Sequence, residues 1–301
     1  MLAEYSMERL KDTPPDELGD RLERGEIVYF PECPVTLPDT DDLNFVRDEL
    51  PELVARKNIS YHPETDRVKL KGAPELADRA RQILKSHSDR IVEFLHDTMP
   101  SLTSGCTIGT SSFRPIQEKG RDLSPHSSNE LVHIDAGAYG ATNGDRILRF
   151  FINANPTEDR VWATKGQFSE LYPRFGSDAG ITPPQRGSSS LDKRAIDHAF
   201  TAFLRGLAHI GLPQAVVVDS SPYDRTMRKF HNFMKDTPSF QQDMSSHQEI
   251  RFPPFSAWMV FTDTVSHASV SGQHAFVNTF LIRLARCRYP DLAPYNILTA
   301  A

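Results

Sequence analysis

The spacing of apolar residues divides the chain into a helical first third and a strand-rich remainder. Apolar side chains recur at a period of about 3.6 residues over 43–55 and 74–98, which predicts two amphipathic helices. Pro100 ends the second of them. The charged start of the chain ends in the apolar, β-branched run Gly25–Phe30, which predicts a short strand. We therefore predict that residues 1–102 form a region of helices and short strands that packs on the rest of the chain.

After residue 102 the pattern changes to short apolar runs separated by Gly, Ser, Asn and Pro, which is typical of an antiparallel sandwich or barrel. A helical insertion is predicted at about 165–247, with helices at Lys193–His209 and Asp224–Lys235. The predicted fold class is α+β, and residues 103–301 are expected to form its β-rich core. The predicted core strands are Cys106–Phe113, Glu130–Ala136, Ile147–Asn155, Ala257–Thr262, Val265–Val270 and His274–Leu284.

Composition narrows the class of protein further. The net charge of −6 argues against a nucleic-acid partner, because phosphate neutralisation needs a basic surface. Cys33, Cys106 and Cys287 are too few and too scattered for a disulfide framework or a zinc ribbon, which favours a reducing compartment. The N-terminus lacks the features of a signal peptide, and no segment resembles a transmembrane helix. We therefore expect a cytoplasmic protein, and the sequence leaves its oligomeric state open.

The tripeptide His-x-Asp is the first candidate for chemistry, but it occurs at two places, about as often as chance predicts. His87-Ser88-Asp89 lies in a predicted helix, where positions i and i+2 point about 200° apart and cannot share an ion. We predict a solvated helix face there. His133-Ile134-Asp135 follows an apolar run, and on a strand positions i and i+2 share a face. This second tripeptide is suited to bind a metal ion, and the alternative is a cross-strand His–Asp hydrogen bond.

A distant histidine would complete a metal site. His267 lies in the apolar run Val265–Val270, just before a predicted hairpin at Ser271-Gly272. A single histidine in such a place is more often a packed core residue. Two histidines and one carboxylate, however, are the ligand set that binds Fe(II) on one face and leaves the other face open. We therefore predict that His133, Asp135 and His267 bind a metal ion.

A basic residue inside an apolar strand predicts an anionic partner. Arg149 lies between Leu148 and Phe150, and burial of an unpaired arginine costs several kcal/mol. Its planar guanidinium matches a carboxylate with two parallel hydrogen bonds. The partner is either the distal carboxylate of 2-oxoglutarate or an Asp or Glu of the protein, and the sequence leaves both open. Asn153 shares the parity of Arg149 along the strand and is predicted to line the same pocket.

The order of the motifs is itself informative, and the main ones are His133-Ile134-Asp135, Gly144–Arg149, Asn153–Pro156, Arg160-Val161-Trp162 and Thr262–Ala268. This order resembles that of the Fe(II)/2-oxoglutarate-dependent dioxygenases. Within them the chain resembles the bacterial 3-deoxy-D-manno-octulosonic acid (Kdo) 3-hydroxylase family. The segments Gly25–Pro31, Arg56–Tyr61 and Ser112–Pro115 extend the likeness over most of the chain.

The resemblance implies a double-stranded β-helix (jelly-roll) core that holds iron through His133, Asp135 and His267. It also implies an oxidoreductase that hydroxylates the 3-position of a Kdo sugar in the inner core of lipopolysaccharide (Kdo-lipid A). The co-substrates would be 2-oxoglutarate and O₂, and the co-products succinate and CO₂. Such a glycolipid acceptor would bring the enzyme to the cytoplasmic face of the inner membrane, in peripheral contact with it.

The chain departs from many relatives in the basic residue that anchors 2-oxoglutarate. Those relatives carry it shortly after the distal histidine, where this chain has the uncharged run Phe276–Asn278. We therefore assign the anchor to Arg149, with Arg283 on the last predicted strand as the reserve candidate.

The acidic sugar needs positive charge of its own, since the net charge of the chain is negative. Arg114 and Arg121, in the loop before the metal motif, are the predicted substrate contacts, and the alternative is that they are solvated surface charges. Phe151, Trp162 and Phe168 are candidates for the apolar walls that exclude water, unless they are ordinary core residues.

Two other functions remain open at this point. A cupin-like metal enzyme without redox chemistry, acting on a sugar acid, would use the same jelly roll. A metal-free, sugar-binding jelly-roll module would use the fold for recognition alone. Other common enzyme classes find no support, because the chain lacks a Gly-x-Ser-x-Gly elbow, a Walker loop and a Cys-x-x-Cys pair.

Overall fold

The computed structural model describes residues 2–53, 58–68, 74–137, 140–181, 191, 196–197, 199–203 and 220–300. Its α-helices are α1 (Met7–Lys11), α2 (Glu17–Glu23), α3 (Thr40–Asn44), α4 (Leu50–Leu53), α5 (Pro74–Thr98), α6 (Pro100–Thr103), α7 (Phe168–Phe175), α9 (Pro222–Asp236), α10 (Pro238–Gln242) and α11 (Pro294–Ala300). The described residues also contain a π-helical turn, η1 (Phe45–Glu49), the 3₁₀ turns η2 (Pro125–Ser127), η4 (Leu284–Arg286) and η5 (Pro290–Leu292), and helical residues between 196 and 203.

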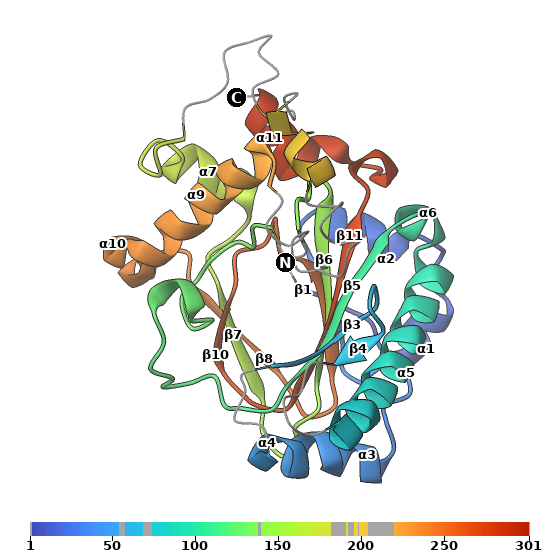
Figure 1. Cartoon of the computed structure of the whole chain (residues 1–301). Helices are drawn as coiled ribbons and strands as arrows, with labels where there is room; N and C mark the ends of the chain where they lie inside the picture. The colour runs from blue at the N-terminus through green and yellow to red at the C-terminus, as the bar shows by residue number, and fades with distance from the viewer. Residues whose placement is uncertain are drawn as a thin grey trace.

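The strands form two sheets (Figure 1). They are β1 (Leu2–Glu4), β2 (Ile27–Phe30), β3 (Ile59–His62), β4 (Arg67–Val68), β5 (Thr107–Arg114), β6 (Arg146–Asn153), β7 (Arg160–Thr164), β8 (Gln248–Phe252), β9 (Ala257–Phe261), β10 (Ala268–Ser271) and β11 (Ala275–Ile282). The larger sheet has the order β1-β2-β9-β6-β11-β5-β3-β4 and the smaller one β10-β7-β8. The described pairings are antiparallel except for β1 with β2. The structure therefore confirms a mixed α+β fold with a large antiparallel sheet.

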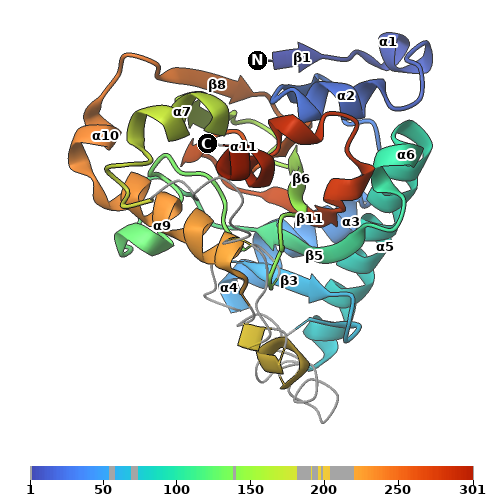
Figure 2. The same cartoon turned by 90° about the horizontal axis from the view of Figure 1, so that it is seen from above.

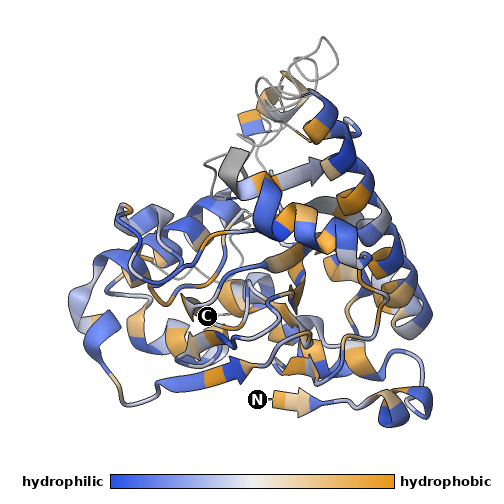
Figure 3. Ribbon diagram, turned by 90° about the horizontal axis from the view of Figure 1, so that it is seen from below, coloured by the Kyte–Doolittle hydropathy of each residue, from blue (hydrophilic) through white to orange (hydrophobic). Residues whose placement is uncertain are grey.

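The helices lie on opposite sides of the strands (Figure 2). Helices α5 and α6 lie on one side, and α7, α9 and α10 of the predicted insertion lie on the other. In the hydropathy colouring of Figure 3, α5 carries both polar and apolar residues, as expected for a helix with one buried face. That face packs on the large sheet through Ala80, Ile83, Leu84, Ile91 and Leu95.

Strands from the N-terminal region pair directly with the rest of the large sheet. Strand β2 pairs with β9, and β3 pairs with β5, so the region contributes strands at both ends of the sheet order. The division of the chain at residue 102 stays a prediction. None of the described helices combines the length and apolarity needed to cross a membrane.

Most predicted strands and the helix at Asp224–Lys235 are confirmed. The predicted strand Val265–Val270 is confirmed only from Ala268, where β10 begins, and two other segments differ. The predicted helix over 43–55 is divided into α3, η1 and α4, and Pro51 lacks the amide hydrogen that a continuous helix requires there. The predicted strand Glu130–Ala136 is wrong, because only His133 forms a bridge, with His267. The predicted helix Lys193–His209 falls largely outside the described residues.

Candidate metal centre

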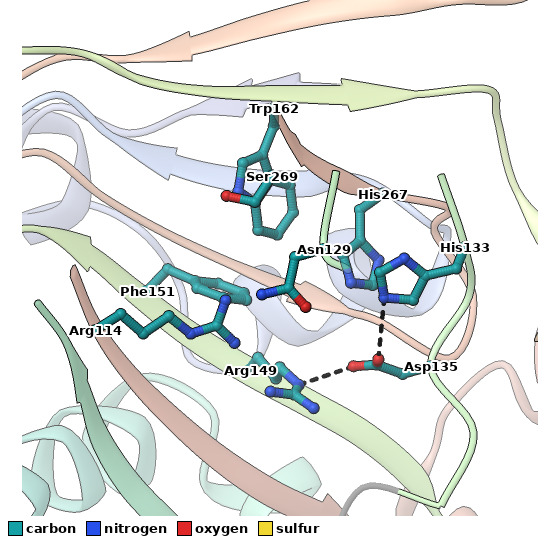
Figure 4. A pocket seen from close by; sticks show the side chains of 9 residues that line it. All are labelled: Arg114, Asn129, His133, Asp135, Arg149, Phe151, Trp162, His267 and Ser269. Atoms are coloured by element: carbon teal, nitrogen blue, oxygen red, sulfur yellow. Dashed lines mark ion pairs between the residues drawn. The ribbon is translucent and has the colours of Figure 1, made fainter. Parts of the chain in front are cut away.

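Three side chains predicted from the sequence converge at one point of the structure. One ligand atom each from His133, Asp135 and His267 lies within 4.8 Å of the other two (Figure 4). Within the described ranges, this is the one group of three His, Cys, Asp or Glu side chains with such a spacing. The ligand types are those that bind ferrous iron on one face.

Backbone hydrogen bonds between two chain segments bring these side chains together. The amide of His133 donates to the carbonyl of His267 at 3.0 Å, and the amide of His267 donates back at 2.8 Å. The amide of Asp135 donates to the carbonyl of Thr262 at 2.8 Å. Because directly opposed residues of an antiparallel pair point the same way, the two imidazole rings lie side by side, with centroids 4.6 Å apart.

The hydrogen bonds of the imidazoles orient them toward a metal. Nδ1 of His133 lies 2.7 Å from the carbonyl oxygen of Leu131, and Nδ1 of His267 lies 3.0 Å from that of Val265. Nδ1 therefore donates its proton to the carbonyl in each case, and Nε2 keeps a free lone pair for a metal. Burial lowers the pKa of His267 to about 4. Burial, together with the neighbouring His267, lowers the pKa of His133 as well, so both rings are neutral at pH 7.

The carboxylate of Asp135 is held in its ionised form. Its Oδ2 lies 2.8 Å from Nε of Arg149, and its Oδ1 lies 3.7 Å from Nε2 of His133. Burial opposes ionisation, but the positive charge of Arg149 outweighs it and lowers the pKa of Asp135 below its usual range. The contact with Arg149 is close but is not aligned as a hydrogen bond. Oδ2 of Asp135 and Nε of Arg149 are therefore both buried without a hydrogen-bond partner. One anionic and two neutral ligands therefore face a place that fits a divalent cation.

The candidate site opens into a pocket between the two sheets (Figure 4), lined by Arg114, Asn129, His133, Asp135, Arg149, Phe151, Trp162, His267 and Ser269. The indole of Trp162 stacks on His267, with ring centroids 5.1 Å apart, and meets the ring of Phe151 nearly at a right angle. Arg114 and Arg149 line the pocket from β5 and β6. The pocket thus combines an aromatic wall with two cationic groups, which suits an organic anion.

Arg114 belongs to a cluster of charged residues around the buried carboxylate of Glu118. Nη1 of Arg114 lies 3.5 Å from Glu118, while Arg160 and Arg121 approach the same carboxylate at 3.3 and 3.6 Å. Burial lowers the pKa of Arg114 to about 10, which leaves it charged at neutral pH. Arg160 also donates to the hydroxyl of Ser269 at 2.7 Å. Of the two predicted substrate arginines, Arg114 therefore lines the pocket, whereas Arg121 contacts Glu118 and does not.

Three other predicted residues lie away from the pocket. Asn153 lies four residues from Arg149 along the strand, or about 13 Å, which is too far to share its pocket. Its side-chain amide instead donates to two backbone carbonyls at 2.9 Å. Arg283 is 56% exposed and paired with Asp145 at 3.2 Å. Phe168, the first residue of α7, packs with residues of α9 in an apolar cluster outside the pocket. Asn153 shares a strand face with Arg149, but a shared face does not imply that two residues are close together. Aromatic character alone does not show whether a residue such as Phe168 lines a pocket or packs in the core.

Two further residues, Asn129 and Ser269, line the pocket without having been predicted to do so. Ser269 lies two residues after His267, so the same-face rule that joined His133 to Asp135 had the means to find it. Asn129 lies in a loop and is held there because the amide of Ser269 donates to its carbonyl at 2.7 Å. No periodic pattern marks such a loop residue.

The other His-x-Asp tripeptide, His87-Ser88-Asp89, lies only partly in solvent, contrary to the prediction. His87 is fully buried, with its ring 4.3 Å from that of Phe276, so the predicted solvated position is wrong for this residue. Helix α5 turns this side toward the sheet. Asp89 does lie in solvent, paired with Lys85 at 2.7 Å. The two side chains diverge as the helical period requires.

A mixed α+β fold in which two histidines and a carboxylate face a cationic pocket has the arrangement of the non-haem iron oxygenases. The model of one particular family, the 3-deoxy-D-manno-oct-2-ulosonic acid (Kdo) hydroxylases, matches residues 6–301. The chain belongs to this family, which confirms the resemblance seen in its motifs.

Comparison with solved structures agrees with this assignment. A structure of the Kdo hydroxylase KdoO, a non-haem Fe(II)/α-ketoglutarate-dependent dioxygenase, in complex with α-ketoglutarate and Fe(III), has 28% identity and a TM-score of 0.79. The same protein in complex with cobalt(II) gives the same values, and its apo structure gives 27% and 0.78. Each match covers 99% of this chain and 95% of the other. No curated protein sequence matches the chain.

Proposed function

We propose that His133, Asp135 and His267 hold Fe(II) in an enzyme that hydroxylates Kdo and uses 2-oxoglutarate and O₂ as co-substrates. The observation that carries the proposal is the convergence of these three ligands at the open pocket. Membership of the Kdo hydroxylase family and the iron and α-ketoglutarate held by the similar KdoO structure support it. When bound, the iron supplies the activation of O₂, while 2-oxoglutarate is oxidised to succinate and CO₂.

The protein's own contribution is to bind and orient the reactants. Three protein ligands on one face would leave room on the ion for the co-substrates. Arg149 lies at the pocket beside Asp135 with an unaligned Nε, so it is placed to take the distal carboxylate of 2-oxoglutarate. Arg283 is not, because it is 56% exposed and does not line the pocket. The aromatic wall of Phe151 and Trp162 excludes water from the same space.

The sugar acid is recognised by the second pocket arginine. Arg114 lines the pocket with 13% of its side chain exposed, is charged, and is only partly neutralised by Glu118 at 3.5 Å, so it is placed to receive the Kdo carboxylate. Arg121 supports it indirectly, because it shares the same glutamate. The oxygen is added at the 3-position of the sugar.

The acceptor is Kdo attached to lipid A, in the inner core of lipopolysaccharide, and the enzyme meets it at the cytoplasmic face of the inner membrane. Peripheral contact is supported by one helical segment, in which Ile196, Phe200 and Phe203 are 75%, 46% and 61% exposed. Residues at this spacing share one helix face. The same segment is anchored by the ion pair of Asp197 with Arg225, at 3.2 Å. Such an apolar face is suited to lie on a lipid surface.

The two sheets form a double-stranded β-helix in this proposal. The order of the strands in two antiparallel sheets and the TM-score of 0.79 to the KdoO structure support it.

The decisive experiment adds Fe(II) and 2-oxoglutarate to the protein without oxygen, and then O₂ and a Kdo-containing glycolipid. The expected results are a weak visible band at about 500 nm, which reports chelation at the open face of the iron, and one added oxygen in the glycolipid by mass spectrometry. Turnover with zinc or manganese and no band would favour the cupin-like enzyme. Failure to retain any metal would favour the sugar-binding module.

A further inference from the structure

The segment that carries His133 and Asp135 is extended, but the backbone of a neighbouring segment pairs with only one of its edges. His133 exchanges hydrogen bonds with His267, and the amide of Asp135 donates to Thr262. In an extended chain the backbone groups of successive residues point to opposite edges, so those of residues i and i+2 share an edge. The amide and carbonyl of Val132 and the carbonyl of Ile134 therefore face away from this pairing.

A glutamine of the helical insertion occupies the second edge. Oε1 of Gln241, at the end of α10, accepts the amide of Val132 at 3.0 Å, and its Nε2 donates to the carbonyl of Val132 at 2.9 Å. These are the two hydrogen bonds that a residue of a paired antiparallel strand would make. The same Nε2 donates to the carbonyl of Met234 at 2.6 Å, which ties Gln241 to α9.

A histidine of α9 forms a hydrogen bond with the next carbonyl along this second edge of the ligand segment. Nδ1 of His231 donates to the carbonyl of Ile134 at 2.7 Å. Its ring also meets the ring of His133 edge to face, with centroids 5.0 Å apart. His231 thus contacts both the backbone between the two candidate ligands and one of the ligands itself.

The helices that carry these two side chains are firmly placed. The ammonium group of Lys165, at the end of β7, donates to the carbonyls of Phe240, Gln241 and Asp243. Met227, Phe230 and Met234 of α9 are buried in one apolar cluster with the side chains of Val132 and Ile134. The insertion therefore packs on the ligand segment through side chains as well as hydrogen bonds.

We propose that Gln241 and His231 are positioning residues for the metal centre, and that through them the insertion replaces the strand that the ligand segment lacks. They fix the spacing of His133 and Asp135 and thereby set the affinity of the site for a divalent metal. This inference rests on the proposed function only in taking these residues as metal ligands.

The test compares Gln241→Leu and His231→Phe, which keep the approximate size of the side chain and remove its hydrogen bonds. Gln242→Leu, at the exposed neighbouring position, is the matched control. His231→Asn is the conservative variant, because its amide nitrogen can replace Nδ1 as a donor. The metal-free proteins are titrated with Co(II) alone, and affinity, the visible spectrum of the bound Co(II) and the melting temperature are measured.

We expect Gln241→Leu and His231→Phe to weaken Co(II) binding by about 10- to 100-fold, the usual effect of removing a partner that orients metal ligands. Their Co(II) spectra should also change, because the ligand geometry changes. His231→Asn should retain affinity within a few fold, and Gln242→Leu should behave like the unmodified protein. If Gln241→Leu fails to fold, Gln241→Glu keeps the acceptor and removes the donor, and should show the same loss of affinity.

Unchanged Co(II) affinity and spectra in these variants would overturn the proposal, whatever happens to the melting temperature. So would a loss of affinity in His231→Phe that His231→Asn does not restore. The titration contains neither 2-oxoglutarate nor sugar, so an enzyme that fails to hydroxylate Kdo would contradict the proposed function and leave this test intact.

Discussion

The same tripeptide pattern, His-x-Asp, occurs in two regions of this chain with opposite outcomes. His87 and His133 are both buried, and burial lowers the pKa of each. Around His133 the backbone is extended, so Asp135 lies on the same side and His267 pairs alongside. Around His87 the backbone is helical, so Asp89 points into solvent, where its side chain is 64% exposed.

The hydrogen bonds of the two imidazoles differ in the same way. Nδ1 of His133 has a backbone carbonyl within 2.7 Å, whereas neither nitrogen of His87 has a hydrogen-bond partner. A buried histidine therefore does not by itself indicate a metal site. What distinguishes the two regions is a fixed tautomer, a carboxylate on the same side and a third ligand from a distant segment.

The sharpest contrast is expected between His133→Ala and His87→Ala. The first variant should lose stoichiometric metal binding and at least about a thousandfold in hydroxylation, because the metal provides several kcal/mol of stabilisation to the reaction. The second should keep both, but lose stability through the cavity that it leaves against Phe276. Metal analysis, turnover and melting temperature check the pair. Loss of metal from His87→Ala would contradict the comparison.

The cationic partners of Asp135 and Asp89, which are Arg149 and Lys85, provide the next contrast. Arg149→Ala should raise the KM for 2-oxoglutarate by about 10- to 100-fold, because charge-assisted hydrogen bonds contribute about 1.5–3 kcal/mol. Lys85→Ala removes the exposed partner of Asp89 and should leave this KM unchanged. Steady-state kinetics at varied 2-oxoglutarate compare the two. An equal KM in both variants would remove Arg149 from its proposed role.

The unpartnered ring of His87 predicts a stability effect that depends on pH. Burial lowers the pKa of His87 to about 3, against about 6.5 in the unfolded chain. Between these values only the unfolded state binds the proton, so stability falls as the pH is lowered, by up to about 1.4 kcal/mol per pH unit from this group. His87→Leu should abolish that contribution and raise the free energy of unfolding at pH 7 by about 1 kcal/mol.

Urea unfolding of the metal-free protein and of His87→Leu at pH 7 and pH 5 measures how the free energy of unfolding changes with pH in each. His133 and His267 are also buried as neutral rings, so part of the acid sensitivity should remain in His87→Leu. If the free energy of unfolding depends on pH equally in the unmodified protein and in His87→Leu, then His87 has a hydrogen-bond partner in solution.

The smallest effect is expected at Asp89. The ion pair with Lys85 spans one helical turn in solvent, and such pairs contribute about 0.3–0.5 kcal/mol. Asp89→Asn should therefore lower the free energy of unfolding by no more than this amount and leave metal binding unchanged. A large effect on either measurement would mean that the second tripeptide does more than its geometry allows.

Much of the fold could be predicted because local period follows from the sequence. Strands β6, β9 and β11 come from largely apolar runs that are buried at nearly every position, and the apolar residues of helix α9 lie on its buried face. The segment around His133 was misjudged because its extended backbone is held by side chains from α9 and α10, more than ninety residues away, rather than by a continuous strand partner. No local pattern carries that information.

The sequence by itself determined the candidate ligands His133, Asp135 and His267, since the His-x-Asp spacing and a histidine in an apolar run before a hairpin can each be read from a few neighbouring residues. It also determined that Arg149 needs an anionic partner. Only the tertiary structure decided that Arg114 lines the pocket while Arg121 and Asn153 do not, and that His87 is buried. The physical reason is that backbone period fixes the direction of a side chain, whereas its surroundings depend on which distant segments pack against it.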